Sequence, residues 1–147
     1  MTKSERVKPI VKVAQDRERA AAQAFSGSQR VLQEREQRLA EVRRYRDEYL
    51  ENYQSKGHSG MSAQQMRTYR NFLLKLEAAV AQQEQLVHTA RCELDQQKAR
   101  WMEKHVRTRA LDNMRTRYVT QEQQEAQRVE QKESDERGLH RPKPDES

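Results

Sequence analysis

The chain has 147 residues, a length that suits a single domain. Apolar residues make up 33% of it and charged residues 35%, whereas an average globular protein has roughly 45–50% and 25%. So little apolar material excludes a thick core and leaves either a disordered chain or a thin one that buries a single stripe. No proline lies between Ile10 and Arg141, and disordered segments usually hold more breakers than this. The composition therefore favours a thin helical structure.

The formal net charge of +6 can indicate binding to a nucleic acid, an anionic membrane or an acidic protein, or it can merely keep the protein soluble. The first residues, MTKSERVKPIVKV, lack the apolar segment of a secretory signal, so none is expected. The longest apolar run, residues 78–81, is far too short to span a membrane. The single cysteine, Cys92, excludes an internal disulfide and fits a reducing, intracellular setting.

The first predicted element is a helix over about residues 5–54. Alternating steps of three and four from Val7 to Tyr53 give fourteen positions, of which ten are apolar or aromatic. An apolar stripe with a period of 3.5 residues is typical of a coiled-coil helix. We call this stripe the seam. Glu18 and Arg46 also fall on it, so we expect the seam to be polar and hydrated at some positions.

A turn is predicted over about residues 55–61, where Gly57 and Gly60 break the helix. Ser62 followed by Gln65 has the spacing of a capping box, which would start a second helix. His58 lies in this turn and could carry protons, but we expect it to be a polar turn residue without chemistry. The turn is therefore expected to act through its geometry.

The second predicted helix covers about residues 62–137. Stepped in the same way from Met66 to Tyr118, it gives sixteen positions, of which eleven are apolar or aromatic. A short link between two amphipathic helices predicts an all-α fold, a long antiparallel two-helix coiled-coil hairpin with a longer second helix. A disordered tail is expected at residues 138–147.

The register follows from pairing the seam positions across the turn. Large and small residues interdigitate when facing residues have numbers that sum to 115, which sets Phe25 against Ala90 and Arg46 against Tyr69. Pairing would then end near Val7 and Thr108. The segment from about residue 110 to 137 is expected to extend beyond it, alone or ordered on a partner.

The two flanks of the seam differ in chemistry. With Leu39 and Met66 at heptad position a, the g positions form an apolar flank and the e positions a charged flank. The apolar flank comprises Ala24, Val31, Arg38, Tyr45, Phe72, Ala79 and Leu86, and the charged flank comprises Gln29, Glu36, Arg43, Arg70, Glu77, Glu84, Arg91 and Lys98. We expect Tyr45 beside Phe72 and Val31 beside Leu86. An uncovered apolar surface favours partner binding or self-association.

No residue pattern indicates catalysis, a cofactor or a metal. A two-helix structure offers little concavity, and no glycine-rich phosphate loop occurs. The four histidines, His58, His88, His105 and His140, lack metal-ligand spacing. The carboxylates alternate with Lys and Arg at helix-face spacings and are expected to form solvated ion pairs. We therefore expect no enzyme.

The end of the hairpin away from the turn is basic. Residues 98–117 carry seven Lys or Arg against two acids, and residues 1–20 carry six against three. Such an end could hold nucleic acid, but that role usually adds a groove-reading motif or stacking aromatic residues. An acidic protein surface is at least as plausible a partner.

Several short motifs resemble the flagellar export family FliJ over nearly the whole chain. They are YRDEYL at 45–50, YRNFLLKLEAAVAQQ at 69–83, Trp101 followed by basic residues and Leu111, and EQKESDE at 130–136. The stalk proteins of injectisome secretion systems are similar as well. The resemblance implies an accessory, non-catalytic role in type III protein export. It also implies a cytoplasmic location, at the inner membrane and bound there indirectly through the export gate.

The resemblance further implies three kinds of partner: the hexameric export ATPase FliI, the export gate protein FlhA and the export chaperones. The residues it assigns to gate binding are Val42, Tyr45, Tyr49, Phe72, Leu76 and Ala79. Val31, Arg38, Gln83 and Leu86 would extend this face, although Arg38 and Gln83 depart from the family's residue types. The basic end would face the ATPase through Lys8, Lys12, Trp101, Lys104, Arg107 and Arg109.

Two alternatives remain at the level of sequence. One is a basic coiled-coil protein that binds nucleic acid or an anionic membrane. The other is a self-assembling scaffold. Binding driven by phosphate contacts should weaken steeply between low and moderate salt, whereas docking through the apolar flank should persist. A scaffold should show a mass that depends on its concentration.

Overall fold

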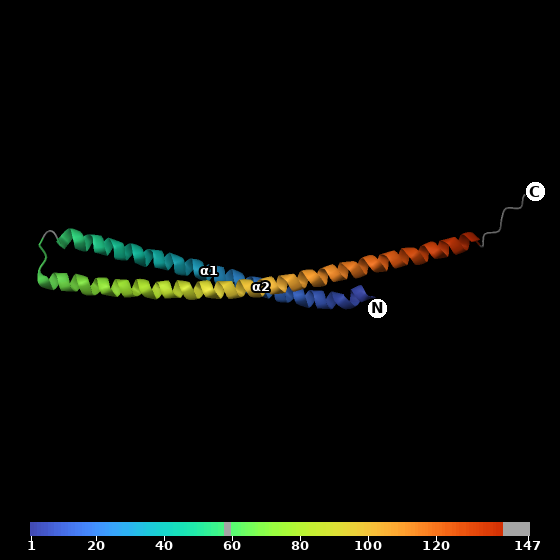
Figure 1. Cartoon of the computed structure of the whole chain (residues 1–147), viewed down its shortest axis with the longest axis horizontal. Helices are drawn as coiled ribbons and strands as arrows, with labels where there is room; N and C mark the ends of the chain where they lie inside the picture. The colour runs from blue at the N-terminus through green and yellow to red at the C-terminus, as the bar shows by residue number, and fades with distance from the viewer. Residues whose placement is uncertain (58–59, 140–147) are drawn as a thin grey trace, which may run out of the picture. The chain divides into compact units, whose positions relative to one another are not determined.

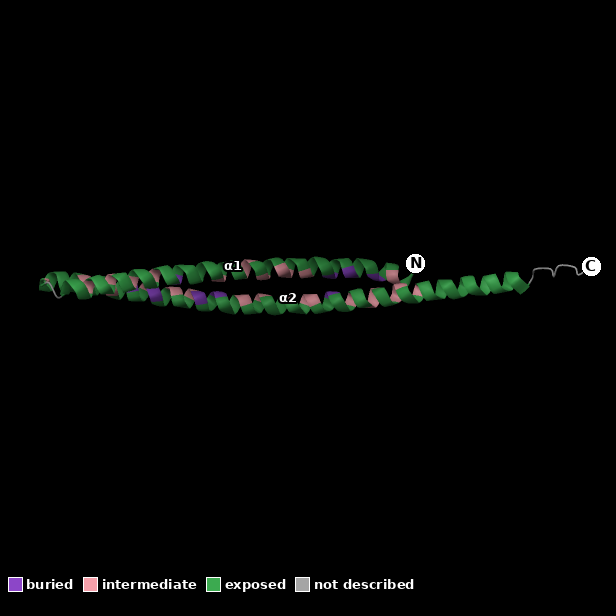
Figure 2. Ribbon diagram, turned by 90° about the horizontal axis from the view of Figure 1, so that it is seen from above, coloured by how far each residue is buried: buried purple, intermediate pink, exposed green. Residues whose placement is uncertain are grey.

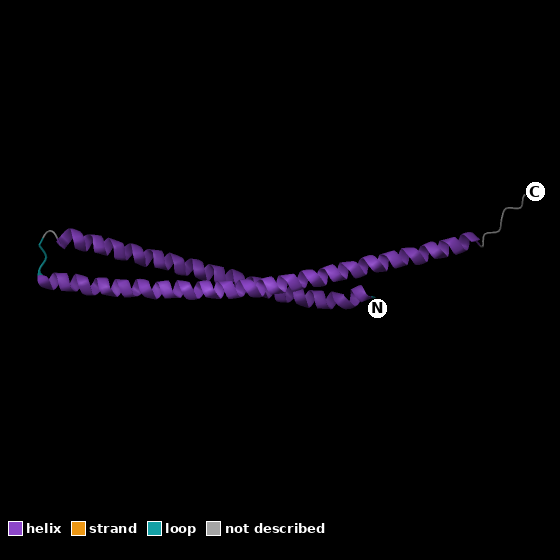
Figure 3. Cartoon of the chain, viewed as in Figure 1, coloured by secondary structure: helices purple, strands orange, loops and turns teal. Residues whose placement is uncertain are grey.

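The computed structural model describes residues 1–57 and 60–139. Helix α1 spans Lys3–Gly57 and helix α2 spans Ala63–Leu139, joined by the turn (Figures 1 and 3). No strand occurs within these described ranges, and the two helices pack against each other. The predicted all-α, antiparallel two-helix hairpin with a longer second helix is confirmed. Both helices run slightly beyond their expected ends, and the expected tail lies outside the described residues from position 140 onward.

The chain divides into two compact units. The turn unit comprises residues 20–102, and the open-end unit comprises residues 1–19 with residues 103–147, of which 103–139 are described. Each unit consists of a segment of α1 beside a segment of α2. Each also has its own part of the seam and its own surfaces, which are described separately below.

Both helices begin with a capping box. At the start of α2, the Ser62 amide donates to Gln65 Oε1 and the Gln65 amide donates to Ser62 Oγ, each at 3.2 Å. This pairing confirms the sequence prediction. At the start of α1, Thr2 and Glu5 make the same exchange at 3.3 Å, and the T-x-x-E spacing could have predicted it. In the turn Gly60 adopts a φ of 85°, a conformation that glycine reaches without strain.

The seam of the turn unit buries a small apolar cluster. Leu39, Val80 and Val87 form its centre, and Leu32 and Val42 pack against them. Nearer the other limit of the unit, Phe25 stacks on Trp101 with a ring-centroid distance of 6.0 Å. Figure 2 shows the buried and half-buried positions along the sides on which the helices face each other. The 3.5-residue stripe thus identified the buried positions correctly.

The seam of the open-end unit combines valines with polar groups. Val11 is its most completely buried side chain, with 1% of its surface exposed. Thr108 is buried too, and its hydroxyl lies 3.2 Å from the Ala14 carbonyl oxygen and 2.9 Å from that of Lys104. Helix pairing continues as far as Glu122, whose carboxylate accepts hydrogen bonds from the Ser4 hydroxyl at 2.6 Å and the Ser4 amide at 3.1 Å.

Beyond Glu122 the second helix has no packed neighbour in the described structure. Every described residue from 123 to 139 is exposed (Figure 2). The sequence placed the start of this extension near residue 110. That expectation was wrong by about three turns, because α1 starts at Lys3 and lies beside α2 up to Glu122.

The predicted register was wrong by one heptad. Phe25 stacks on Trp101 instead of facing Ala90, and the Thr108 hydroxyl reaches Ala14, which was expected to face Trp101. A shift of seven residues keeps every a and d position on the seam, which explains why the buried residues were right and their partners wrong. It also replaces two expected contacts. Arg46 pairs with Asp47 instead of Tyr69, and Glu18 pairs with His105 instead of Gln97.

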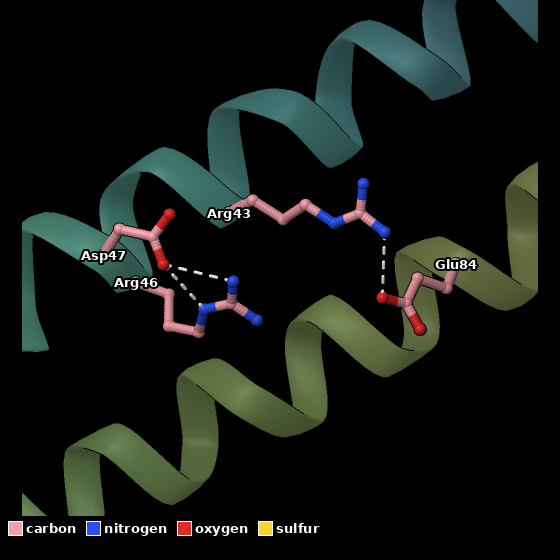
Figure 4. Close-up of polar contacts among 4 residues, drawn as sticks. All are labelled: Arg43, Arg46, Asp47 and Glu84. Carbon is pink, nitrogen blue, oxygen red and sulfur yellow. Dashed lines mark hydrogen bonds and ion pairs between the residues drawn. The ribbon is translucent and has the colours of Figure 1, made fainter.

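The charged flank contributes to the preference for the observed register. The guanidinium of Arg43 lies 3.0 Å from the carboxylate of Glu84, and that of Arg91 lies 3.1 Å from Glu36 (Figure 4 shows the first pair, and the Arg46–Asp47 pair within α1). In the predicted register, one heptad away, Glu36 would have faced Glu84. Like charges at such positions repel, so the charged flank adds to the discrimination between the two registers.

Reversing one of these charges should weaken the hairpin, and reversing both should restore it. Glu84→Arg sets two guanidinium groups side by side, whereas Arg43→Glu with Glu84→Arg recreates the pair in reverse. Both side chains are about half exposed, at 48% and 51%, so we expect a coupling free energy of about 0.5 kcal/mol. Denaturant unfolding of the two single variants and the double variant measures this value. A coupling indistinguishable from zero would contradict a role for this pair in the register.

Candidate partner-binding surfaces

Five aromatic side chains gather in the turn unit, near the turn. The ring centroids of Tyr49 lie 4.7 Å from Phe72 and 5.0 Å from Tyr69, and Tyr45 meets Phe72 edge-on at 6.4 Å. Tyr53 completes the set at 5.6 Å from Tyr69. We call these five residues the aromatic cluster. The expected contact between Tyr45 and Phe72 across the helices is present, although other contacts show the helices shifted by one heptad from the predicted register.

The aromatic cluster is half-buried at its base and exposed at its rim. Tyr45 is 52% exposed and Phe72 36%, whereas the other three are half-buried on the seam. Burial raises the pKa of Tyr49 above its ordinary value, with smaller contributions from Tyr69 and Tyr45. The cluster therefore presents aromatic surface to solvent at Tyr45 and Phe72, where the described chain supplies no third element to cover it.

The six residues proposed for gate binding fall into two groups. Tyr45 and Phe72 are exposed on the apolar flank. Leu76 is buried, and Val42 packs against the core cluster, so these two contribute to the seam. Tyr49 and Ala79 are half-buried between the two groups. A partner approaching this side would contact the exposed rings first.

The four residues of the proposed extension are not equally accessible. Val31 is 45% exposed and Arg38 is also exposed, whereas Gln83 and Leu86 are half-buried. The side-chain oxygen of Gln83 is buried and accepts no hydrogen bond within the described residues. Val31 lines a groove of about 440 Å³ together with Ala24, Gly27, Ser28, Arg30, Glu34, Ala90 and Glu93. This groove therefore lies on the same flank as Tyr45 and Phe72, and the exposed Arg38 lies between Val31 and Tyr45 along α1.

Five of the six residues proposed to face the ATPase lie in the open-end unit. Lys8, Lys12, Arg107 and Arg109 are exposed there, and Lys104 is half-buried. Trp101 belongs to the turn unit and is half-buried against Phe25 on the seam. The basic residues and Trp101 therefore have different surroundings.

A polar network lies on the seam of the open-end unit. His105 Nδ1 and Glu18 Oε1 are 2.6 Å apart. Their hydrogen bond is the main reason that the pKa of Glu18 is lowered below its ordinary value, and partial burial opposes it. Together with the nearby Thr108 hydroxyl, Glu18 and His105 thus have hydrogen-bond partners at the point where polar residues interrupt the apolar stripe. We assign it a structural role.

The open-end unit also contains a groove that was not predicted from the sequence. It has a volume of about 250 Å³ and is lined by Pro9, Ile10, Val13, Ala14, Arg17, Arg107 and Leu111. We call it the open-end groove. A signal for it was present, because Ile10 occupies the same heptad position as Val31 and Tyr45, three and five heptads before them.

The described ranges contain neither a cluster of possible metal ligands nor a candidate membrane-spanning helix. No group of three or more His, Cys, Asp or Glu residues gathers there in a way that could hold a metal ion. His88 lies 3.7 Å from the exposed Cys92, and this pair stands alone among the described residues. His58 and His140 lie outside the described residues. No described helix is long and apolar enough to cross a membrane.

The fold and these surfaces define the chain as a coiled-coil helical hairpin with exposed apolar and basic surfaces. The family model described as "Flagellar FliJ protein" matches residues 3–143, and the chain therefore belongs to the FliJ family. This confirms the resemblance seen in the motifs and gives the chain a role related to flagellar biogenesis and protein export. No curated protein and no solved structure was found to match it.

Proposed function

We propose that the chain is a non-catalytic stalk component of the flagellar type III export apparatus, needed for flagellum assembly and motility. The basic open-end unit engages the hexameric export ATPase FliI, and the apolar flank of the turn unit engages the export gate protein FlhA. The chain also carries or hands over export chaperones. It works on the cytoplasmic face of the inner membrane and reaches the membrane through the gate.

The observation that supports this proposal most is the exposed rim of the aromatic cluster. Two large rings, Tyr45 and Phe72, meet edge-on in solvent at the positions that the FliJ resemblance assigns to gate binding. Aromatic residues of this kind are enriched at the centres of protein interfaces, because they bury much apolar surface with few rotatable bonds. A protein partner is the simplest explanation for leaving them uncovered.

The charge of the open-end unit supports the second contact. Residues 1–19 and 103–117 of this unit carry eleven Lys or Arg against five Asp or Glu, whereas residues 118–139 carry three against six. A basic surface attracts an acidic partner over about one Debye length, roughly 8–10 Å at physiological salt. An acidic lining in the ATPase ring would therefore hold this unit and orient it.

The test is to add the purified protein to the purified export ATPase and to measure hexamer formation and ATP hydrolysis. We expect both to rise with protein concentration and to saturate, because a stalk that fills the ring stabilises the assembled state. Unchanged assembly and hydrolysis at saturating protein would overturn the proposal. Binding to duplex DNA or to anionic vesicles, lost between low and moderate salt, would instead favour the nucleic-acid or membrane alternative.

A further inference from the structure

The lining of the open-end groove combines apolar residues, which we call its floor, with two arginines, which we call its rim. Ile10 and Val13 are 51% and 50% exposed, although both are branched aliphatic residues on a well-formed helix. Ala14 and Leu111 close the floor from the seam side. Leaving apolar surface in contact with water is unfavourable, and covering it stabilises a complex by roughly 25 cal/mol for each Å². The groove is therefore suited to receive an apolar group.

Two arginines define the polar chemistry of this groove. Arg17 from α1 and Arg107 from α2 line it, and none of its other lining residues is charged. Within the described part of the chain, neither guanidinium forms an ion pair with a carboxylate. Arginine binds carboxylates through two parallel hydrogen bonds, so both groups are suited to recognise acidic side chains.

The size of the groove limits what can occupy it. At about 250 Å³ it falls below the roughly 300–1,000 Å³ of pockets that enclose small molecules. It is open between two helices, and such grooves are commonly filled by side chains from one face of a third helix. An apolar side chain with carboxylates one turn away on either side would match both the floor and the rim.

We propose that the open-end groove docks an acidic amphipathic helix of the export ATPase, which inserts one large apolar side chain over Ile10 and Val13 between Arg17 and Arg107. This inference rests on the proposed function and adds the chemistry of the partner segment. The apolar insertion supplies most of the affinity, and the two arginines fix the orientation of the docked helix. Diffuse attraction between a basic surface and an acidic ring would supply neither the apolar insertion nor a fixed orientation.

The test uses the full chain and the purified export ATPase, with binding measured by calorimetry or surface plasmon resonance. Ile10→Ala with Val13→Ala removes the apolar floor and keeps the helix, because alanine favours helix. Arg17→Glu with Arg107→Glu reverses the rim. We expect each pair to weaken binding by about 10- to 100-fold, as loss of interface anchors does.

Matched controls separate docking in the groove from general effects. Val106→Ala truncates another exposed aliphatic residue of the same unit, 65% exposed and outside the groove lining. Arg19→Glu with Arg117→Glu changes the net charge of the unit by the same amount as the rim variant, at exposed positions away from the groove. We expect these controls to bind within about twofold of the unmodified protein, or slightly more weakly at low salt for the charge control.

The outcomes distinguish this inference from the proposed function. If the unmodified chain binds the ATPase and the Ile10→Ala, Val13→Ala variant binds equally well, the groove inference is overturned and the proposed function stands. If only charge reversal weakens binding, and the control reversal does so equally, the attraction is diffuse and the inference is again overturned. If the unmodified chain does not bind at all, the proposed function itself fails.

Discussion

Truncation of Tyr45 and Phe72 to alanine together is expected to abolish binding to the export gate while the hairpin remains folded. Both rings are exposed, so most of their surface is available to a partner. Alanine substitution of aromatic anchors at an interface typically costs 2–4 kcal/mol for each residue. Binding should therefore weaken by at least about 100-fold, measured by calorimetry with the cytoplasmic part of the gate protein FlhA.

The matched control for this experiment lies on the same two helices. Leu50 and Leu74 are also exposed apolar residues, at 36% and 58%, but their heptad positions are on the side of the charged flank. Leu50→Ala with Leu74→Ala should leave gate binding intact. Circular dichroism should show the same helix content in both double variants. A large loss of helicity in the Tyr45, Phe72 variant would mean that these rings hold the helices together and are not docking residues.

The substitution Val11→Asp should open the open-end unit and leave the turn unit folded. Val11 is the most deeply buried side chain of the seam, and an unpaired carboxylate at such a site costs several kcal/mol. The seam of this unit is narrow, so few other buried contacts can compensate. Amide hydrogen exchange should show protection lost over about residues 4–19 and kept around Leu39 and Val80.

A neighbouring valine provides the control for this prediction. Val13 lies two residues away on the same helix and is half exposed, so Val13→Asp places the same charge in water. It should keep nearly all protection. Simultaneous loss of protection around Leu39 in the Val11 variant would show that the two units unfold together, which would contradict local opening.

The sequence specified which residues face the seam because the physical constraint is local. A helix repeats every 3.6 residues, so apolar residues spaced by three and four must share one side wherever the helix is placed. The capping box at Ser62 and the exposed flank at Tyr45 and Phe72 likewise follow from the spacing of residues along one helix. None of these features requires knowledge of the partner residue on the other helix.

The register could not be obtained in that way because seam positions recur every heptad. Volume matching of Phe25 with Ala90 was a weak criterion, since a heptad shift offers Trp101 as a stacking partner instead. The charges of Glu36 and Glu84 were a better criterion, because the predicted register would have placed these two carboxylates side by side. The open-end groove depends on how Pro9, Val13 and Arg17 surround the space between two helices, which heptad position alone does not determine.

The repeating seam has a mechanical consequence. Sliding one helix along the other by a heptad, about 10 Å, would return the same kinds of side chain to the buried stripe. Part of the preference for one alignment therefore resides in exposed ion pairs such as Arg43–Glu84, and added salt weakens such pairs. The contribution of these pairs to the free-energy gap between neighbouring alignments therefore falls as ionic strength rises.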